Sequence, residues 1–319
     1  MKKQFVNTLE EGDVVNDYYV ATRRDLRDTQ SGGKFLGLVL KDRTGEIGGV
    51  LWHNAAAIAA KFSAGDVVNV RGTVNTYQSR LQLRVDQVYP LRAGEYETDD
   101  LVARTENTSE TLKEYTTLLE TVENPWLKKL LDLFLNDAEF LAKFEGASAG
   151  KRWHHAAAGG LLRHCYEMAR IAETVSTLFP DIDRDLLQAG IFVHDIGKLE
   201  ELSQGMHVDY TTIGKLVGHL QIGCLMLTER IDRIEGFPEP LRLELLHLIL
   251  SHHGEMEMGS PVVPKTLEAI VLSKIDDLDA QADAFVRVIG ETRKKNQEWS
   301  DYIDLIGRQI WSKKPGPQE

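Results

Sequence analysis

The chain contains 319 residues, of which 42% are hydrophobic and 27% are charged, and its formal net charge at pH 7 is −12. This length fits about two domains, and the composition excludes a mainly disordered chain. No apolar run approaches the ~20 residues of a membrane-spanning helix, and two cysteines, Cys165 and Cys224, are too few for a disulfide framework, so we expect a cytoplasmic protein without a membrane partner.

The first 95 residues are predicted to form a small β-barrel. Segments in which apolar and polar residues alternate are separated by turn residues, as in strands with one buried face. The five expected strands span residues 14–24, 35–41, 47–52, 67–74 and 81–89, and one helix, with Asn54 as its N-cap, spans residues 54–62. A helix between the third and the fourth of five strands is the order of an OB-fold barrel.

Residues 96–312 are predicted to be helical almost throughout. Stretches with a 3.6-residue apolar period span residues 112–122, 127–135, 161–179, 185–199, 212–234, 241–250 and 266–289. We expect residues 96–150 to form a helical linker and the start of a helical domain, residues 151–312 to form its main part, and residues 313–319 to form a flexible tail. The predicted fold class is therefore multidomain, with an N-terminal β-barrel and an all-α bundle.

The charge is distributed unevenly between these two parts. Residues 1–95 carry 13 Lys/Arg and 11 Asp/Glu, whereas the remainder carries 24 Lys/Arg and 38 Asp/Glu. An acidic domain repels a polyanion unless bound cations or a local basic patch offset its charge.

The barrel supplies the candidate nucleic-acid surface, because OB-fold barrels bind single strands in a basic groove with aromatic stacking surfaces. The predicted substrate-binding residues of the barrel are Arg24, Tyr77, Arg80 and Arg84. Arg80 and Arg84 alternate outward along the last strand and offer a basic stripe. Phe35 and Trp52 are instead expected in the core, since side chains fill the interior of small barrels.

Nine of the ten histidines follow residue 150, and the most informative of them belongs to the pair His194-Asp195. This pair directly follows an apolar run, so its carboxylate is expected to be buried. An unpartnered buried carboxylate is very costly, and a metal ion would supply the missing cation. Lys198 shares the helical face of the pair, where it suits a phosphate oxygen; a solvated helix lysine is the alternative.

Further histidines and aspartates recur on other apolar helices that must pack together. They are His164, His219, His252, His253 and either Asp276 or Asp277. A metal site is favoured for His164, His194, Asp195 and Asp276. For His219, His252 and His253, a second metal ion and phosphate binding are both open. Asp277, Asp279 and the pair Glu200-Glu201 are expected to be solvated surface charges.

These residues resemble the H…HD…D ligand set of the HD-domain metal-dependent phosphohydrolases, through His164, His194-Asp195 and Asp276. The additional histidines resemble those of the two-metal branch, which includes the HD-GYP phosphodiesterases. An OB-type barrel ahead of such a domain resembles the YhaM-type 3′→5′ exoribonucleases. The matching segments are Trp153–Ala156, Gly159–His164, His194–Lys198, Ile213–His219, Leu250–Gly254, Lys41–Glu46, Leu51-Trp52 and Arg80–Leu83.

The resemblance implies a two-metal site that hydrolyses single-stranded RNA from its 3′ end and releases nucleoside 5′-monophosphates. It implies two divalent transition-metal ions, Mn in the first place, with Fe, Co, Ni or Zn as alternatives. The first ion would be held by His164, His194, Asp195 and Asp276, and the second by Asp195, His219, His252 and His253. Asp195 and Lys198 are the predicted catalytic residues. Lys198, His154 and His155 are expected to contact the substrate phosphate, and either histidine or water would protonate the leaving 3′-oxygen.

Two other functions are compatible with the residues. The helical domain could hydrolyse a cyclic (di)nucleotide or a nucleoside phosphate, with the barrel regulating it. Alternatively, the protein could bind single-stranded nucleic acid without catalysis. The expected partner is single-stranded RNA, with single-stranded DNA and self-association into a homo-oligomer both open.

Overall fold

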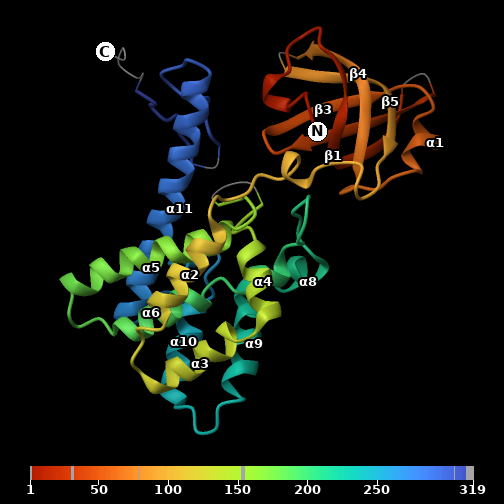
Figure 1. Cartoon of the computed structure of the whole chain (residues 1–319). Coiled ribbons are helices and arrows are strands. Elements are labelled where there is room, and N and C mark those ends of the chain that lie inside the picture. The colour runs from red at the N-terminus through yellow and green to blue at the C-terminus, as the bar shows by residue number, and fades with distance from the viewer. Residues whose placement is uncertain (1, 30–31, 79, 152–154, 305, 314–319) are drawn as a thin grey trace. The chain divides into compact units, whose positions relative to one another are not determined.

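The computed structural model describes residues 2–29, 32–78, 80–151, 155–304 and 306–313 (Figure 1). The chain divides into two compact units: Met1–Arg104 with Gln204–Val208, and Thr105–Ser203 with Asp209–Glu319. Within the described ranges, we find no helix that combines the length and the apolar character needed to cross a lipid bilayer. The domain boundaries expected at residues 95, 150 and 312 stay predictions.

The first unit contains a closed barrel of five strands. These are β1 (Val14–Asp28), β2 (Lys34–Asp42), β3 (Gly45–Leu51), β4 (Val67–Tyr77) and β5 (Arg80–Pro90), with α1 (Ala55–Ala59) between β3 and β4. The strand order is β1-β2-β3-β5-β4. The pair β3–β5 is parallel and the other pairs described are antiparallel. This closed barrel confirms the predicted OB-fold.

The expectation that Trp52 lies in the core is wrong, whereas Asn54 does occupy the N-cap position of α1. The strand ends at Leu51, so Trp52 leaves the barrel wall and is 53% exposed, with its ring centroid 5.0 Å from that of the half-buried Phe35. Asn54 precedes α1 in the left-handed region (φ 55°), and its side chain makes no capping hydrogen bond with the described residues. An exposed tryptophan packed on a half-buried phenylalanine therefore lies where the sequence predicts core.

The N-terminal segment is tied to the barrel by a buried lysine. Lys2 Nζ donates to the carbonyl oxygen of Tyr18 (2.5 Å) and lies 3.6 Å from Asp42 Oδ2, and the side chains of Lys2 and Asp42 are fully buried. Asp42 also accepts hydrogen bonds from the backbone N–H groups of Val6 and Thr44, both at 2.8 Å. Burial lowers the pKa of Lys2 to about 8, and the neighbouring carboxylates oppose that shift.

We expect Asp42→Ala to lower the free energy of unfolding of the barrel by about 3 kcal/mol, because it leaves a buried ammonium without this carboxylate and two backbone donors without an acceptor. Urea unfolding followed by hydrogen exchange of the barrel strands measures this change. Asp28→Ala is the control, since the Asp28 side chain is 80% exposed. Equal unfolding midpoints for the two variants would contradict the prediction.

The second unit is helical. Its helices are α2 (Thr108–Leu119), α3 (Pro125–Leu135), α4 (Ala138–Gly146), α5 (Gly160–Leu178), α6 (Arg184–Val193), α7 (Lys198–Glu201), α8 (Thr212–Leu216), α9 (His219–Ile231), α10 (Glu239–Ser251) and α11 (Leu267–Lys294). Short 3-10 turns occur at Val6–Thr8 and Thr98–Asp100 in the first unit and at Met256–Met258 in the second. One apolar core joins these helices, with Phe134, Phe144 and Phe192 among its largest fully buried side chains.

The structure interrupts two predicted helices at functional positions. The expected helix 185–199 ends at Val193, and α7 begins only at Lys198, so His194-Asp195 lies in the connection. The expected helix 212–234 is divided between Leu216 and His219. The apolar period continues across the first interruption because Phe192 and Leu199 on either side both pack in the same core, whereas Leu216 before the second interruption is exposed.

Candidate metal centre

Histidine and aspartate side chains from five parts of the helical unit converge on one buried region. They are His164 on α5, His194 and Asp195 after α6, His219 at the start of α9, His252 and His253 after α10, and Asp276 on α11. The side chains of His164, His194, Asp195 and His252 are at most 1% exposed. Tertiary packing thus brings together every residue of the predicted ligand set.

Two of the histidines are oriented by the backbone of the helix that precedes them. His194 Nδ1 lies 2.8 Å from the carbonyl oxygen of Ile191, and His252 Nδ1 lies 2.8 Å from that of Ile249. A carbonyl oxygen only accepts, so each Nδ1 carries the proton. Each Nε2 is therefore the lone-pair atom and faces the centre.

Two further histidines are oriented by carboxylates. Asp279 Oδ2 lies 2.7 Å from His164 Nδ1, and Glu201 Oε1 lies 3.1 Å from His219 Nδ1 and 3.0 Å from the backbone nitrogen of His219. Asp279 is 6% exposed and Glu201 is 8% exposed, so the expectation that both are solvated surface charges is wrong. Metal-binding histidines commonly donate their other ring N–H to such a partner.

Asp195 lies between two groups of histidines. Its Oδ2 is 3.3 Å from His194 Nε2 and 3.9 Å from His164 Nε2. Its Oδ1 is 3.7 Å from His219 Nε2 and 3.7 Å from His252 Nε2. One carboxylate therefore offers a different oxygen to each group.

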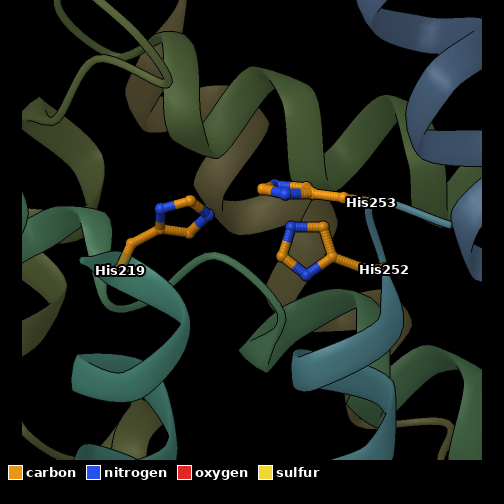
Figure 2. Close-up of side chains that lie close together, drawn as sticks. All are labelled: His219, His252 and His253. Carbon is orange, nitrogen blue, oxygen red and sulfur yellow. The ribbon is translucent and has the colours of Figure 1, made fainter. Parts of the chain in front are cut away.

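The ligand atoms form compact sets on the two sides of Asp195. Donor atoms of His164, His194 and Asp276 lie within 4.8 Å of one another, and so do those of His219, His252 and His253. Figure 2 shows the second set, with the ring of His219 directed toward the rings of His252 and His253. The ring centroids of His252 and His253 are 4.3 Å apart.

Unsatisfied polar atoms show that this donor set fits divalent cations. His194 Nε2, Asp195 Oδ1 and His219 Nε2 are buried and have no hydrogen-bond partner among the described residues. Buried polar atoms normally have a partner, and each of these atoms can donate a lone pair to an ion. A donor set rich in imidazole suits transition metals better than Mg²⁺, which prefers oxygen ligands.

The protonation states of His252 and Asp195 also suit metal binding. Burial lowers the pKa of His252 well below its usual value, so its imidazole is neutral at pH 7. Burial opposes ionisation of Asp195, but the ammonium group of Lys198 outweighs it and holds the pKa of Asp195 well below its usual range. His164 differs, because Asp276 and Asp279 outweigh its burial and raise its pKa to about 9.

Lys198 lies inside the centre rather than on a solvated helix face. Its Nζ is 2.5 Å from Asp195 Oδ2, and its side chain is 12% exposed. Burial opposes the charge, but the carboxylate of Asp195 outweighs it and raises the pKa of Lys198. The ammonium group therefore stays charged next to the candidate ligands.

The remaining residues predicted for this site lie in different surroundings. His155 Nε2 is 2.8 Å from Asp279 Oδ2, so this histidine joins the carboxylate that orients His164. His154 lies outside the described residues. Asp277 is exposed and its carboxylate accepts a hydrogen bond from Gln281 (2.8 Å), whereas the neighbouring Asp276 faces His164.

The structure separates the predicted nucleic-acid residues of the barrel into two places. Tyr77 and Arg80 are register partners at the β4–β5 hairpin, and Arg84 lies further along β5 with a 59% exposed side chain. Arg24 lies on the part of β1 that pairs with β2. There it lines a cavity of about 230 Å³ together with Leu26, Ala56, Ala59 and Ala60.

Two residues that contact candidate ligands, Asp279 and Glu201, were missed from the sequence, although each carries a weak signal. Asp279 follows Asp276 by three positions on α11, so the two share a helical face. Glu201 lies three positions after Lys198 on α7. In both cases the spacing places a carboxylate near the centre. Only the packing of α5 and α9 shows that Asp279 contacts His164 and that Glu201 contacts His219.

Comparison with known proteins agrees with both units. Residues 161–281 match the HD domain family, and residues 19–91 match a family of OB-fold nucleic acid binding domains. The chain therefore combines an OB-fold barrel, similar to nucleic acid binding domains, with a helical region that matches the HD domain, a fold of metal-dependent phosphohydrolases. This result confirms the predicted fold class.

Solved structures similar to the barrel include a domain of replication protein A and a related protein. The second OB-fold domain of replication protein A from Methanococcus maripaludis is 23% identical over 29% of this chain and 98% of its own, with a TM-score of 0.25. The replication factor A related protein from Methanobacterium thermoautotrophicum is 22% identical over 29% of this chain and 94% of its own, with a TM-score of 0.26.

Glu201→Ala is expected to weaken the binding of one Mn²⁺ ion by about 10- to 100-fold, because His219 loses the acceptor that orients its ring. Calorimetric titration of the metal-free protein measures both affinities. Glu200→Ala is the matched control, since Glu200 is 50% exposed and lies 3.5 Å from Lys143. If the two variants bind Mn²⁺ alike, Glu201 has no positioning role.

Proposed function

We propose that the protein is a metal-dependent 3′→5′ exoribonuclease that releases nucleoside 5′-monophosphates from single-stranded RNA. The observation that carries this proposal is the position of Asp195, with one carboxylate oxygen toward each histidine group. The OB-fold domain on the same chain supports a nucleic-acid substrate. Direction and preference for RNA follow from the resemblance to YhaM-type enzymes.

Seven side chains would hold the cations. His164, His194, Asp195 and Asp276 would bind the first ion, and Asp195, His219, His252 and His253 would bind the second. Mn²⁺ is the first choice, with Fe, Co, Ni and Zn as alternatives. When bound, such a pair of ions lowers the pKa of water to give a nucleophile near neutral pH and offsets the charge of the phosphoryl group.

The remaining steps belong to the side chains around the ions. Asp279 and Glu201 keep the rings of His164 and His219 in position, so that little reorganisation accompanies the reaction. Lys198 would donate a hydrogen bond to a non-bridging phosphate oxygen as charge develops there. The proton for the leaving 3′-oxygen would come from water, from His154 or from His155.

The barrel would hold the single strand through Arg24, Tyr77, Arg80 and Arg84. The exposed ring of Trp52, which lies beside the half-buried Phe35, adds a surface on which bases could stack. Because residues 1–95 carry only two more basic than acidic residues, we expect modest affinity that falls with salt.

The double variant Arg80→Ala/Arg84→Ala is expected to bind single-stranded RNA more weakly and with less salt dependence. Loss of two phosphate contacts makes the negative slope of log affinity against log salt shallower by about 1.4. Fluorescence anisotropy with labelled RNA in EDTA measures both changes. Arg104→Ala, which removes a cation paired with Asp99 at 3.1 Å, serves as control; an unchanged slope in the double variant would exclude these arginines from the RNA surface.

A degradation assay with 5′-labelled single-stranded RNA and Mn²⁺ tests the proposed function. The expected result is stepwise shortening from the 3′ end, release of nucleoside 5′-monophosphates and complete inhibition by EDTA. Intact RNA together with turnover of a cyclic dinucleotide would favour the alternative phosphodiesterase. If no substrate in the panel is cleaved with any of the five metals, the protein is not this enzyme.

A further inference from the structure

The chain after α11 folds back on the helix rather than continuing as a loose tail. Within residues 297–304 and 306–312, Ser300 N–H donates to Ile310 O (2.9 Å) and Ser312 N–H donates to Glu298 O (2.8 Å). Arg293 Nε, on the last turn of α11, donates to Ser312 O (2.9 Å). These two segments, which we call the C-terminal hairpin, lie beside the end of α11 in Figure 1 and are joined by isolated antiparallel bridges.

The C-terminal hairpin presents large aromatic side chains to solvent. Trp299 is 54% exposed, Tyr302 is 62% exposed and Trp311 is 56% exposed. Trp299 and Trp311 are partners in an antiparallel bridge, so their side chains leave the same face of the hairpin. Ile310, by contrast, is buried, so the hairpin has a buried apolar side chain while its aromatic rings face solvent.

The same region is basic, although its domain is acidic. Residues 293–313 carry five Lys/Arg and three Asp/Glu, whereas residues 96–292 carry 18 Lys/Arg and 34 Asp/Glu. Lys294 and Arg308 are exposed, and Lys295 is exposed with an ion pair to Asp301 at 3.3 Å. A local excess of cations beside exposed rings complements a polyanion with aromatic bases.

We propose that the C-terminal hairpin is a second binding surface for single-stranded nucleic acid, separate from the barrel. Bases would stack on Trp299, Tyr302 and Trp311, and Lys294, Lys295 and Arg308 would contact phosphates. A second copy of the chain fits this surface less well, because two identical basic hairpins repel each other when they meet face to face. The choice of single-stranded nucleic acid as the ligand rests on the proposed function. The test, however, measures RNA binding and does not require cleavage.

Anisotropy of a labelled 20-nucleotide single-stranded RNA, titrated with the full chain in EDTA, tests this proposal. Trp299→Ala/Tyr302→Ala/Trp311→Ala is expected to bind at least about tenfold more weakly, since removal of one stacking ring commonly costs that much. Phe179→Ala is the matched control, because this ring is 57% exposed at the end of α5. The same titration with single-stranded DNA is expected to show a similar loss, because stacking does not involve the sugar.

A more conservative variant separates the loss of RNA binding from any loss of folding. Trp299→Phe/Trp311→Phe retains a ring at both positions and is expected to bind RNA within about threefold of the wild type, while RNA quenches less of its tryptophan fluorescence. Unchanged RNA affinity in the triple alanine variant would overturn the proposal, and so would a change in light-scattering mass without a change in RNA affinity. These outcomes can be interpreted even if the protein does not cleave RNA, because they depend on binding alone.

Discussion

Asp195→Ala is expected to lower kcat/KM for RNA by at least about 10³-fold, the largest effect of any single substitution in the centre. The variant removes the side chain that offers one oxygen to His194 and another to His219. It also leaves the ammonium of Lys198 without its carboxylate partner at 2.5 Å. Both proposed ions lose a ligand, so the loss is greater than that expected from a histidine that serves one ion.

Single-turnover cleavage of labelled RNA at saturating Mn²⁺ measures this loss. Asp195→Asn keeps the shape of the side chain and separates the loss of charge from any effect on packing. Asp277→Ala is the control, because Asp277 is exposed beside the candidate ligand Asp276. Activity of Asp195→Ala within tenfold of the wild type would exclude a bridging role for this carboxylate.

Gly197→Ala is expected to destabilise the helical domain by about 3 kcal/mol and to weaken metal binding with it. A Cβ atom at this position would lie 2.0 Å from the carbonyl oxygen of His219 and 2.7 Å from the backbone nitrogen of Gly223. Both contacts are with the backbone of α9, which cannot rotate away as a side chain does. The start of α9 must therefore move, and His219 moves with it.

Thermal unfolding of the metal-free protein and Mn²⁺ titration measure the two effects. Gly290→Ala is the matched control, since a Cβ atom there meets nothing within 4 Å on α11. This control is expected to be neutral or stabilising by up to about 1 kcal/mol, because alanine is the better helix former. A Gly197→Ala variant with the melting temperature and Mn²⁺ affinity of the wild type would show that the close approach of the two backbones is not required.

The interruption of two helices could not be predicted from periodicity. Residues 185–199 and 212–234 each keep a continuous apolar face, so the pattern predicts uninterrupted helices. The structure breaks both of them where Gly197 approaches His219. That contact joins segments 22 positions apart, and a local pattern contains no information about it. The barrel was more predictable, because alternation along each strand directly reflects which face is buried.

The candidate ligands were predictable because an imidazole or carboxylate buried in an apolar segment requires a cation or a hydrogen-bond donor beside it. The side chains that orient them were not. Glu201 and Asp279 look like ordinary surface charges in the sequence, and only the packing of helices places them against His219 and His164. Trp52 shows the opposite error, since an aromatic residue at the end of a strand predicts core but lies beyond the barrel wall.

Anomalous diffraction from crystals of the full chain grown with Mn²⁺ tests the two-ion centre most directly. We expect two peaks, one among His164, His194 and Asp276 and the other among His219, His252 and His253, with an oxygen of Asp195 next to each. A single peak, no peak, or manganese bound away from Asp195 would contradict a two-ion centre bridged by this carboxylate.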